Sequence, residues 1–293
     1  MSPLQVWVLA ARPKTLPAAV APVIAGTAVA YYEDGVHWIS AVLAILTALL
    51  LQVAANFAND ALDFRRGADT GERLGPTRVT ASGMVSAEGV MRATAVTLAL
   101  AVVTGLPLVF RGGWPILLLG LAAIVCAVAY TGGPFPLGYL GLGEVFVFIF
   151  FGLAAVAGTA YIQTGELTAL ALAMSVPIGA LAVGILIVNN LRDIETDRAA
   201  GKKTLAVRLG ARNTRLEYGV MLAIAGASPV VFWAVGWLDW PVVLTLVWWP
   251  FGVALWNQIS VRTGRELNPT LGNTGRALLV YSVVLSTALV LSA

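Results

Sequence analysis

Nine runs of apolar residues dominate this 293-residue sequence, and each run is close to the length of a helix that crosses a membrane. A helix needs about 20 consecutive apolar residues to span a bilayer, where every backbone polar group must be satisfied within the helix. Hydrophobic residues make up 59% of the chain and charged residues 11%, which excludes an ordinary soluble domain. We therefore predict an all-α, polytopic membrane bundle, a single domain over residues 1–293, with nine transmembrane helices at residues 15–32, 38–59, 89–109, 114–131, 140–161, 167–190, 217–236, 240–259 and 273–292.

The basic residues between these runs predict the orientation of the bundle. Arg111 is the only Lys or Arg in the connections on one side, which are residues 32–37, 111–113, 163–166 and 237–239. The opposite side contains the N-terminal segment and the connections 60–88, 132–139, 191–216 and 260–272, which are rich in Lys and Arg. Because basic connections stay in the cytoplasm, we expect a plasma-membrane protein with a cytoplasmic N-terminus and a C-terminus outside.

The rest of the composition narrows the class of protein further. The net charge of +3 is too small to indicate a nucleic-acid partner, so the lipid bilayer is the expected macromolecular environment. Cys126 is the only cysteine, which excludes a disulfide within the chain. Residues 1–13 lack the pattern of a removable signal peptide.

Amide and carboxylate residues gather where the second apolar run ends. Asn56, Asp60 and Asp63 follow one another at spacings of four and three, so a helix places them on one face. Carboxylates at this position oppose the helix dipole and are costly near hydrocarbon. We therefore expect a cation to offset both costs.

The sixth run ends in a second motif of the same kind. Asn189, Asp193 and Asp197 are spaced by four residues, and the Asn-x-x-x-Asp pattern of Asn56 and Asp60 is repeated. The predicted topology brings both motifs to the cytoplasmic end of the bundle. Several oxygen ligands of this kind suit Mg²⁺, which we predict as the cofactor.

Basic side chains follow each acidic motif, and a diphosphate needs such cations beside its metal. The candidates are Arg65, Arg66, Arg73, Arg78, Lys202 and Lys203. The alternative is that these residues only obey the positive-inside rule, which by itself explains Arg208, Arg212 and Arg215. For Asn56 and Asn189, a hydrogen bond between helices is the alternative to a contact with metal or substrate.

A third polar stretch, residues 130–144, is rich in Gly and Pro and predicts a turn between the fourth and fifth helices. Tyr130 and Tyr139 lie near the expected membrane interface, where tyrosines are common for reasons unrelated to a site. Glu144 falls inside a predicted span, so we expect it to face the interior of the bundle.

These motifs resemble the UbiA superfamily of intramembrane aromatic prenyltransferases over essentially the whole chain. Within that superfamily they are most similar to the 1,4-dihydroxy-2-naphthoate polyprenyltransferases of menaquinone synthesis. The Tyr-x-x-x-Lys element of some relatives is absent, so its basic role would fall to Arg73 or Arg78. The residues that carry the resemblance are Arg12-Pro-Lys14-Thr-Leu-Pro, Asn59-Asp60-Ala-Leu-Asp63, Tyr130-Thr-Gly-Gly-Pro and Asn190-Leu-Arg192-Asp193-Ile-Glu195-Thr-Asp197 through Lys203-Thr-Leu-Ala-Val-Arg208.

The resemblance implies Mg²⁺-dependent transfer of a polyprenyl chain from its diphosphate to 1,4-dihydroxy-2-naphthoate, with loss of diphosphate and CO₂, to give demethylmenaquinol. It implies catalytic roles for Asp60, Asp63, Asp193 and Asp197, which with Asp69 would be the metal ligands. Diphosphate contacts would come from the basic candidates above together with Asn56 and Asn189. The implied acceptor-site residues are Arg12, Lys14, Tyr130, Tyr139 and Asn190.

Two other functions remain open at this point. A related prenyltransferase with another acceptor, such as 4-hydroxybenzoate, would share the metal motifs. A cation-coupled transporter would instead place its acidic residues near the membrane midplane, beside broken helices. The acidic motifs here lie at one face and only Glu144 is deeper, which disfavours the transporter.

Overall fold

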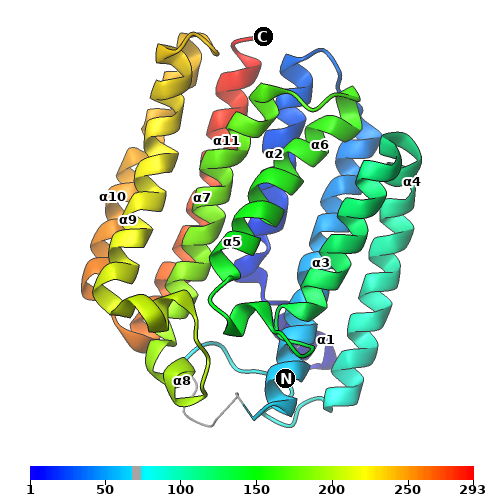
Figure 1. Cartoon of the computed structure of the whole chain (residues 1–293), viewed down its shortest axis with the longest axis vertical. Coiled ribbons are helices and arrows are strands. Elements are labelled where there is room, and N and C mark those ends of the chain that lie inside the picture. Colours follow the sequence, from blue (N-terminus) through cyan, green and yellow to red (C-terminus); the bar gives the residue numbers. More distant parts are fainter. Residues whose placement is uncertain (68–73) are drawn as a thin grey trace.

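The computed structural model describes residues 1–67 and 74–293, and the regular elements of these residues are all helices (Figure 1). One element, η3 (Phe148–Ala154), is a π-helix between α5 and α6. The short 3₁₀ helices are η1 (Pro13–Thr15), η2 (Leu137–Tyr139), η4 (Trp240–Trp248) and η5 (Gly264–Glu266). The α-helices are α1 (Pro3–Ala11), α2 (Pro17–Tyr32), α3 (Trp38–Arg65), α4 (Ala87–Ala129), α5 (Gly143–Val147), α6 (Ala155–Thr164), α7 (Ala169–Arg192), α8 (Ile194–Ala199), α9 (Leu205–Ala234), α10 (Trp249–Val261) and α11 (Leu267–Val290).

The prediction of a membrane-spanning helical bundle is confirmed. In the described residues, seven helical segments are long and apolar enough to cross a membrane, or eight if the bent pair Pro3–Thr15 and Pro17–Tyr32 forms one span. The count treats α4 as one helix, although α4 covers two of the predicted runs. Gly113 interrupts α4 with φ 69° and ψ −158°, a conformation that suits glycine, and the chain folds back there (Figure 1). Nine separate spans remain a prediction.

Three predicted helix boundaries differ from the structure. The segment 191–216 was predicted as a connection, yet it contains α8 and the start of α9 at Leu205. The Thr204 side chain accepts a hydrogen bond from the backbone N–H of Val207, so a local cap begins α9 before its apolar part. The helix α11 starts at Leu267, ahead of its predicted start, and α3 continues to Arg65, so the first acidic motif lies within a helix.

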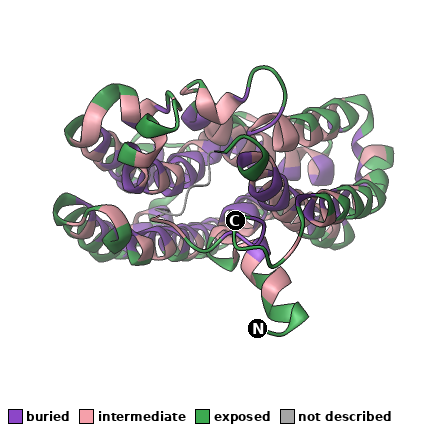
Figure 2. Cartoon of the chain, turned by 90° about the horizontal axis from the view of Figure 1, so that it is seen from below, coloured by how far each residue is buried: buried purple, intermediate pink, exposed green. Residues whose placement is uncertain are grey.

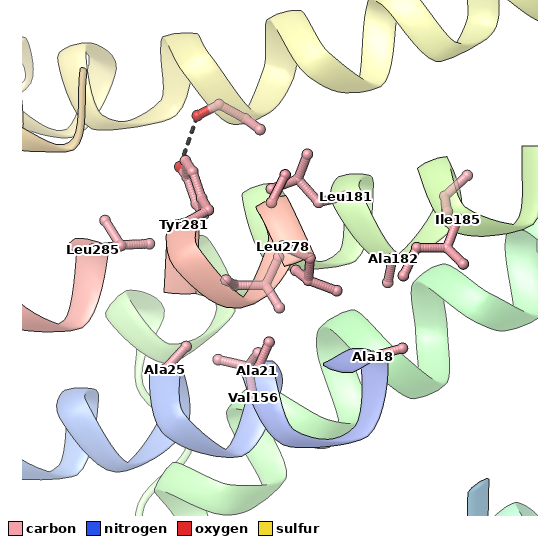
Figure 3. Close-up of a cluster of buried hydrophobic side chains, with 14 of the residues drawn as sticks. Ala18, Ala21, Ala25, Val156, Leu181, Ala182, Ile185, Leu278, Tyr281 and Leu285 are labelled. Atoms are coloured by element: carbon pink, nitrogen blue, oxygen red, sulfur yellow. Dashed lines mark hydrogen bonds between the residues drawn. The ribbon is translucent and has the colours of Figure 1, made fainter. Parts of the chain in front are cut away.

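The core is centred on α7, which is the most buried of the candidate spans: 83% of its apolar stretch is buried inside the protein. Small residues let its neighbours approach closely. In Figure 3, Ala21 and Ala25 of α2 face Leu181 of α7 and Leu278 of α11, and Tyr281 donates a hydrogen bond to the Ala225 carbonyl oxygen at 2.7 Å. A side chain at Gly152 would meet the Gly179 backbone of α7, with its Cβ 2.8 Å from the Gly179 Cα.

Apolar side chains also cover much of the outer surface of the bundle. Figure 2 shows buried residues between the helices and exposed residues on their outer faces. Phe110 and Trp114 are 83% and 71% exposed. An exterior of this kind suits lipid as the surrounding solvent, so the described chain is a multi-pass membrane protein.

Candidate active site

Asp60 of the first motif is buried, and both of its carboxylate oxygens accept hydrogen bonds from the backbone of the connection that follows α3. It is 1% exposed, and its Oδ2 and Oδ1 accept hydrogen bonds from the N–H groups of Val79 and Thr80 at 3.1 and 3.0 Å. Both carboxylate oxygens thus hold residues 79–80 against the end of α3.

Asp63, one helical turn later, joins three parts of the chain. Arg78 donates to its Oδ2 at 2.7 Å, and the Tyr139 hydroxyl donates to its Oδ1 at 2.7 Å. Lys202, which follows the second motif, lies 3.4 Å from the same Oδ1. Asp63 therefore links the first motif to the 130–144 turn and to the second motif, and the two motifs lie at the same end of the bundle.

Asp193 of the second motif lies at the break between α7 and α8, where Arg192 holds it. The Arg192 Nε and Nη2 atoms donate to the two carboxylate oxygens of Asp193 at 2.8 and 2.5 Å. The same guanidinium donates to Oδ1 of Asn189 at 2.8 Å and to Oδ1 of Asn268, in α11, at 3.0 Å. Arg192 is 2% exposed, so a single buried cation orients the oxygen atoms of the second motif.

Asp197, in α8, is the least engaged of these carboxylates. Among the described residues its ion-pair partner is Lys202, with Nζ 3.7 Å from Oδ1. Burial raises the pKa of Asp197 to about 6; Lys202 opposes this shift, while the negative charges of Asp193 and Asp63 add to it. The charge of Asp197 is therefore incompletely compensated.

A polar cavity of about 100 Å³ lies between the two motifs. It brings together ten of the predicted site residues, namely Arg12, Asp63, Arg78, Tyr130, Tyr139, Asn189, Asn190, Asp193, Asp197 and Lys202. Carboxylates and cations thus line one compartment, as the binding of a metal diphosphate requires.

A second cavity, of about 420 Å³ and mostly apolar, lies beside the polar one. Asn59 and Tyr130 line both cavities, so the two meet at these side chains. Leu106, Leu117 and Leu121 line the apolar cavity and are 47%, 45% and 52% exposed. The apolar cavity therefore extends from the polar site towards the outer, lipid-facing surface of the bundle.

The metal ligand set that the sequence predicts is not assembled within the described residues. In residues 1–67 and 74–293, no group of three or more His, Cys, Asp or Glu side chains is placed to hold a metal. Asp69 and Arg73, two of the predicted site residues, lie outside the described residues. Asp63, Asp193 and Asp197 share the polar cavity, and the incompletely compensated Asp197 makes this oxygen set fit a hard cation.

The other predicted residues lie around the two cavities. Arg66 stacks on the Tyr139 ring at 5.3 Å and Lys202 lies 4.6 Å from that ring, so Tyr139 contacts a cation from each motif. Arg65 pairs with the exposed Glu88 at 3.7 Å.

Three further candidates do not line the polar cavity and have other contacts. Asn56 donates to the Ala11 carbonyl and the Thr15 hydroxyl, an interhelical role that the sequence left open, and it lines the apolar cavity. Lys14 packs its side chain near Gly272, and the backbone N–H of Lys203 donates to the Tyr139 carbonyl.

Sequence reasoning missed several residues that shape this site. Asn59 lines both cavities and accepts a hydrogen bond from Thr131. Asn268 donates to the Leu74 carbonyl and so ties Arg192 to the first connection. The position of Asn59 inside the first motif was a usable signal, whereas nothing in the sequence connects Asn268 to either motif.

The membrane-spanning helical bundle with two facing acidic motifs has the architecture of a membrane-embedded prenyltransferase. A model of the UbiA prenyltransferase family matches residues 19–273, and the chain belongs to this family. It is 42% identical over 285 residues to a 1,4-dihydroxy-2-naphthoate octaprenyltransferase of Mycobacterium tuberculosis, which covers 97% of this chain and 96% of that protein.

Two solved structures share the fold. A UbiA homologue from Aeropyrum pernix matches 96% of this chain and 98% of its own, with a TM-score of 0.72 and 15% identity. A homologue from Archaeoglobus fulgidus bound to GPP and Mg²⁺ matches 96% and 99%, with a TM-score of 0.67 and 17% identity.

Proposed function

We propose that this prenyltransferase transfers a polyprenyl chain from its diphosphate to 1,4-dihydroxy-2-naphthoate, releasing diphosphate and CO₂ and forming demethylmenaquinol. The observation that carries the proposal is that the polar cavity, lined by carboxylates of both motifs, meets the apolar cavity at Asn59 and Tyr130. A diphosphate on a long isoprenoid tail needs these two environments side by side. The choice of acceptor follows the relative that is 42% identical over almost the whole chain.

Asp63, Asp193 and Asp197 are the residues that would hold Mg²⁺, with Asp60 fixing the connection beside them and Asp69 a further candidate. Bound Mg²⁺ would neutralise the diphosphate and help it to leave. Lys202 and Arg78 line the same cavity and supply positive charge to the departing group.

The reaction needs no external proton. The bond between the allylic carbon and its diphosphate oxygen breaks, and its electron pair leaves with the diphosphate. The ring carbon that bears the carboxylate forms a bond to the allylic carbon. The bond to the carboxylate then breaks, its electron pair returns to the ring, and CO₂ departs.

The chain's own residues position these partners. The apolar cavity, lined by Phe150 and Phe151 among others, holds the tail and keeps water from the allylic cation. Arg12 lines the polar cavity, so it is the better placed of the two basic candidates for the acceptor carboxylate. Lys14, the other candidate, packs near Gly272.

We propose the plasma membrane as the location, with the polar cavity facing the cytoplasm, because the basic connections lie at that end of the bundle. A cysteine introduced at Ser82, within the first connection, should react with a membrane-impermeant thiol reagent only in inverted vesicles. Reaction in right-side-out cells would reverse the orientation.

The test of the function uses the purified protein with a polyprenyl diphosphate, and either 1,4-dihydroxy-2-naphthoate or 4-hydroxybenzoate, with and without Mg²⁺. The expected result is Mg²⁺-dependent product and CO₂ from the naphthoate. Product from the benzoate alone would retain the metal site and replace the acceptor. No product from either acceptor, with folded protein, would reject the proposal.

A further inference from the structure

We propose that Glu144 is a positioning residue: it orients the amide of Asn190 so that the Asn190 Oδ1 accepts a hydrogen bond from a phenolic hydroxyl of the aromatic acceptor. The inference rests on the proposed function and describes how the same site orients its acceptor.

Glu144 lies in the first turn of α5, buried among helices, and is 7% exposed. Its Oε1 accepts a hydrogen bond from Nδ2 of Asn190 at 2.9 Å. Its Oε2 is buried and has no hydrogen-bond partner among the described residues. A buried carboxylate with one oxygen unused is costly, so its presence needs a reason beyond holding α5 against α7.

The pairing with Glu144 determines which end of the Asn190 amide faces the cavity. Because Nδ2 of Asn190 donates to Oε1 of Glu144, the Oδ1 atom of the same amide points away from Glu144. Asn190 lines the polar cavity, and its Oδ1 has no hydrogen-bond partner within residues 1–67 and 74–293. The site therefore presents a fixed hydrogen-bond acceptor to whatever enters the cavity.

The fixed acceptor lies close to where the ring must react. Asn190 and Tyr130 both line the polar cavity, and Tyr130 also lines the apolar one. The Tyr130 hydroxyl lies beside Gly143, next to Glu144, where an added Cβ would be 2.9 Å from it. A ring hydroxyl that donates to Oδ1 gains electron density, which favours attack by the ring on an allylic cation.

Glu217, in α9, provides a matched control. It is half-buried, its Oε2 has no hydrogen-bond partner among the described residues, and it lies close enough to Glu144 for their charges to interact. Its side chain makes no hydrogen bond to a residue of either cavity within the described chain. Removing its charge should therefore leave the orientation of Asn190 unchanged.

The first experiment compares Glu144→Gln with Glu217→Gln in steady-state prenyl transfer. A glutamine at 144 both donates and accepts, so it permits either orientation of the Asn190 amide. The acceptor KM should rise on the order of tenfold in Glu144→Gln, the effect of one hydrogen bond, while the KM for polyprenyl diphosphate stays unchanged. Glu217→Gln should resemble the wild type. Equal increases in both KM values, or the same shift in Glu217→Gln, would overturn the proposal.

A second experiment separates positioning from general packing. In an Asn190→Ala background, Glu144→Gln should have no further effect on the acceptor KM, because Glu144 acts only through Asn190. An undiminished tenfold effect in that background would overturn the proposal.

A third experiment works even if Glu144→Gln fails to fold. The dissociation constants of 1,4-dihydroxy-2-naphthoate and its two monohydroxy analogues, 1-hydroxy- and 4-hydroxy-2-naphthoate, are measured without polyprenyl diphosphate on the wild type and on Asn190→Ala. Asn190→Ala should weaken the dihydroxy compound about tenfold and spare the analogue that lacks the contacted hydroxyl. Equal weakening of all three compounds would overturn the proposal. A wild type that does not turn over the naphthoate would instead refute the proposed function.

Discussion

The two acidic motifs share a sequence pattern but differ in what already binds their carboxylates. In the first motif, both oxygens of Asp60 accept backbone N–H groups, and Asp63 is bonded to Arg78 and Tyr139. In the second motif, Asp193 is held by one arginine, and within residues 1–67 and 74–293 the side chain of Asp197 has an ion pair with Lys202 at 3.7 Å as its one partner. In the first motif, the Asp60 carboxylate therefore holds the connection in place, whereas in the second motif the Asp197 carboxylate is available to a ligand.

The largest effect should come from the available carboxylate. Asp197→Asn should lower prenyl transfer on the order of a hundredfold or more, because it removes charge where a cation and a diphosphate would meet. Its thermal stability should not fall, because only an ion pair at 3.7 Å is lost. Glu195→Gln, on the same short helix and exposed, is the control and should keep activity. Similar losses in both variants would contradict the division between the motifs.

The next effect tests the cation behind the second motif. Arg192→Lys keeps the charge but cannot contact both oxygens of Asp193 at once. The Mg²⁺ concentration for half-maximal activity should rise roughly tenfold to a hundredfold, as for other residues that orient metal ligands. Arg198→Lys, which alters an exposed pair with Glu195, should leave that concentration unchanged. An unchanged Mg²⁺ requirement in Arg192→Lys would show that Asp193 is oriented by other contacts.

A substitution in the first motif should change the stability of the fold. Asp60→Asn replaces one acceptor oxygen by an N–H group that faces a backbone N–H, so unfolding should become about 2 kcal/mol more favourable. A lower melting temperature in detergent, compared with Asp197→Asn and with the exposed Asp239→Asn, would be the expected result. Equal melting temperatures for Asp60→Asn and Asp197→Asn would erase the difference between the motifs.

The smallest effect concerns the contact between the two motif connections. A Cβ at Gly75 would lie 2.7 Å from Nη2 of Arg192, so the guanidinium must shift in Gly75→Ala. We expect a Mg²⁺ requirement that rises only a few-fold, because the side chain can move to relieve the contact. In the double variant Gly75→Ala/Arg192→Lys the two effects should not add. Full additivity would mean that Gly75 acts elsewhere.

The fold was largely predictable because bilayer thickness sets the length of apolar runs. The start of α9 was not, because Arg208, Arg212 and Arg215 make its first turns resemble a connection. A local cap at Thr204 outweighs that polarity. Helix boundaries therefore need capping geometry as well as hydropathy.

For the site, spacing in the sequence predicted two acidic faces at one end of the bundle. It could not predict their partners, because these come from distant segments. The N–H groups that occupy Asp60, the Asn268 side chain beside Arg192 and the Asn190 amide paired with Glu144 depend on helix packing. The same Asn-x-x-x-Asp pattern can therefore have a structural role in one place and a ligand-binding role in another, depending on which segments pack against it.

Because the apolar cavity extends towards lipid, the effective concentration of a polyprenyl substrate at the site would be set by the bilayer. The diphosphate keeps its tail in the bilayer, so its effective concentration is its share of the lipid and not its amount per volume of solution. Adding empty lipid to an assay, with protein and total substrate held constant, should dilute the polyprenyl diphosphate and raise its apparent KM. On the proposed function, the enzyme would take its polyprenyl diphosphate from the plane of the bilayer and its Mg²⁺ from the aqueous phase.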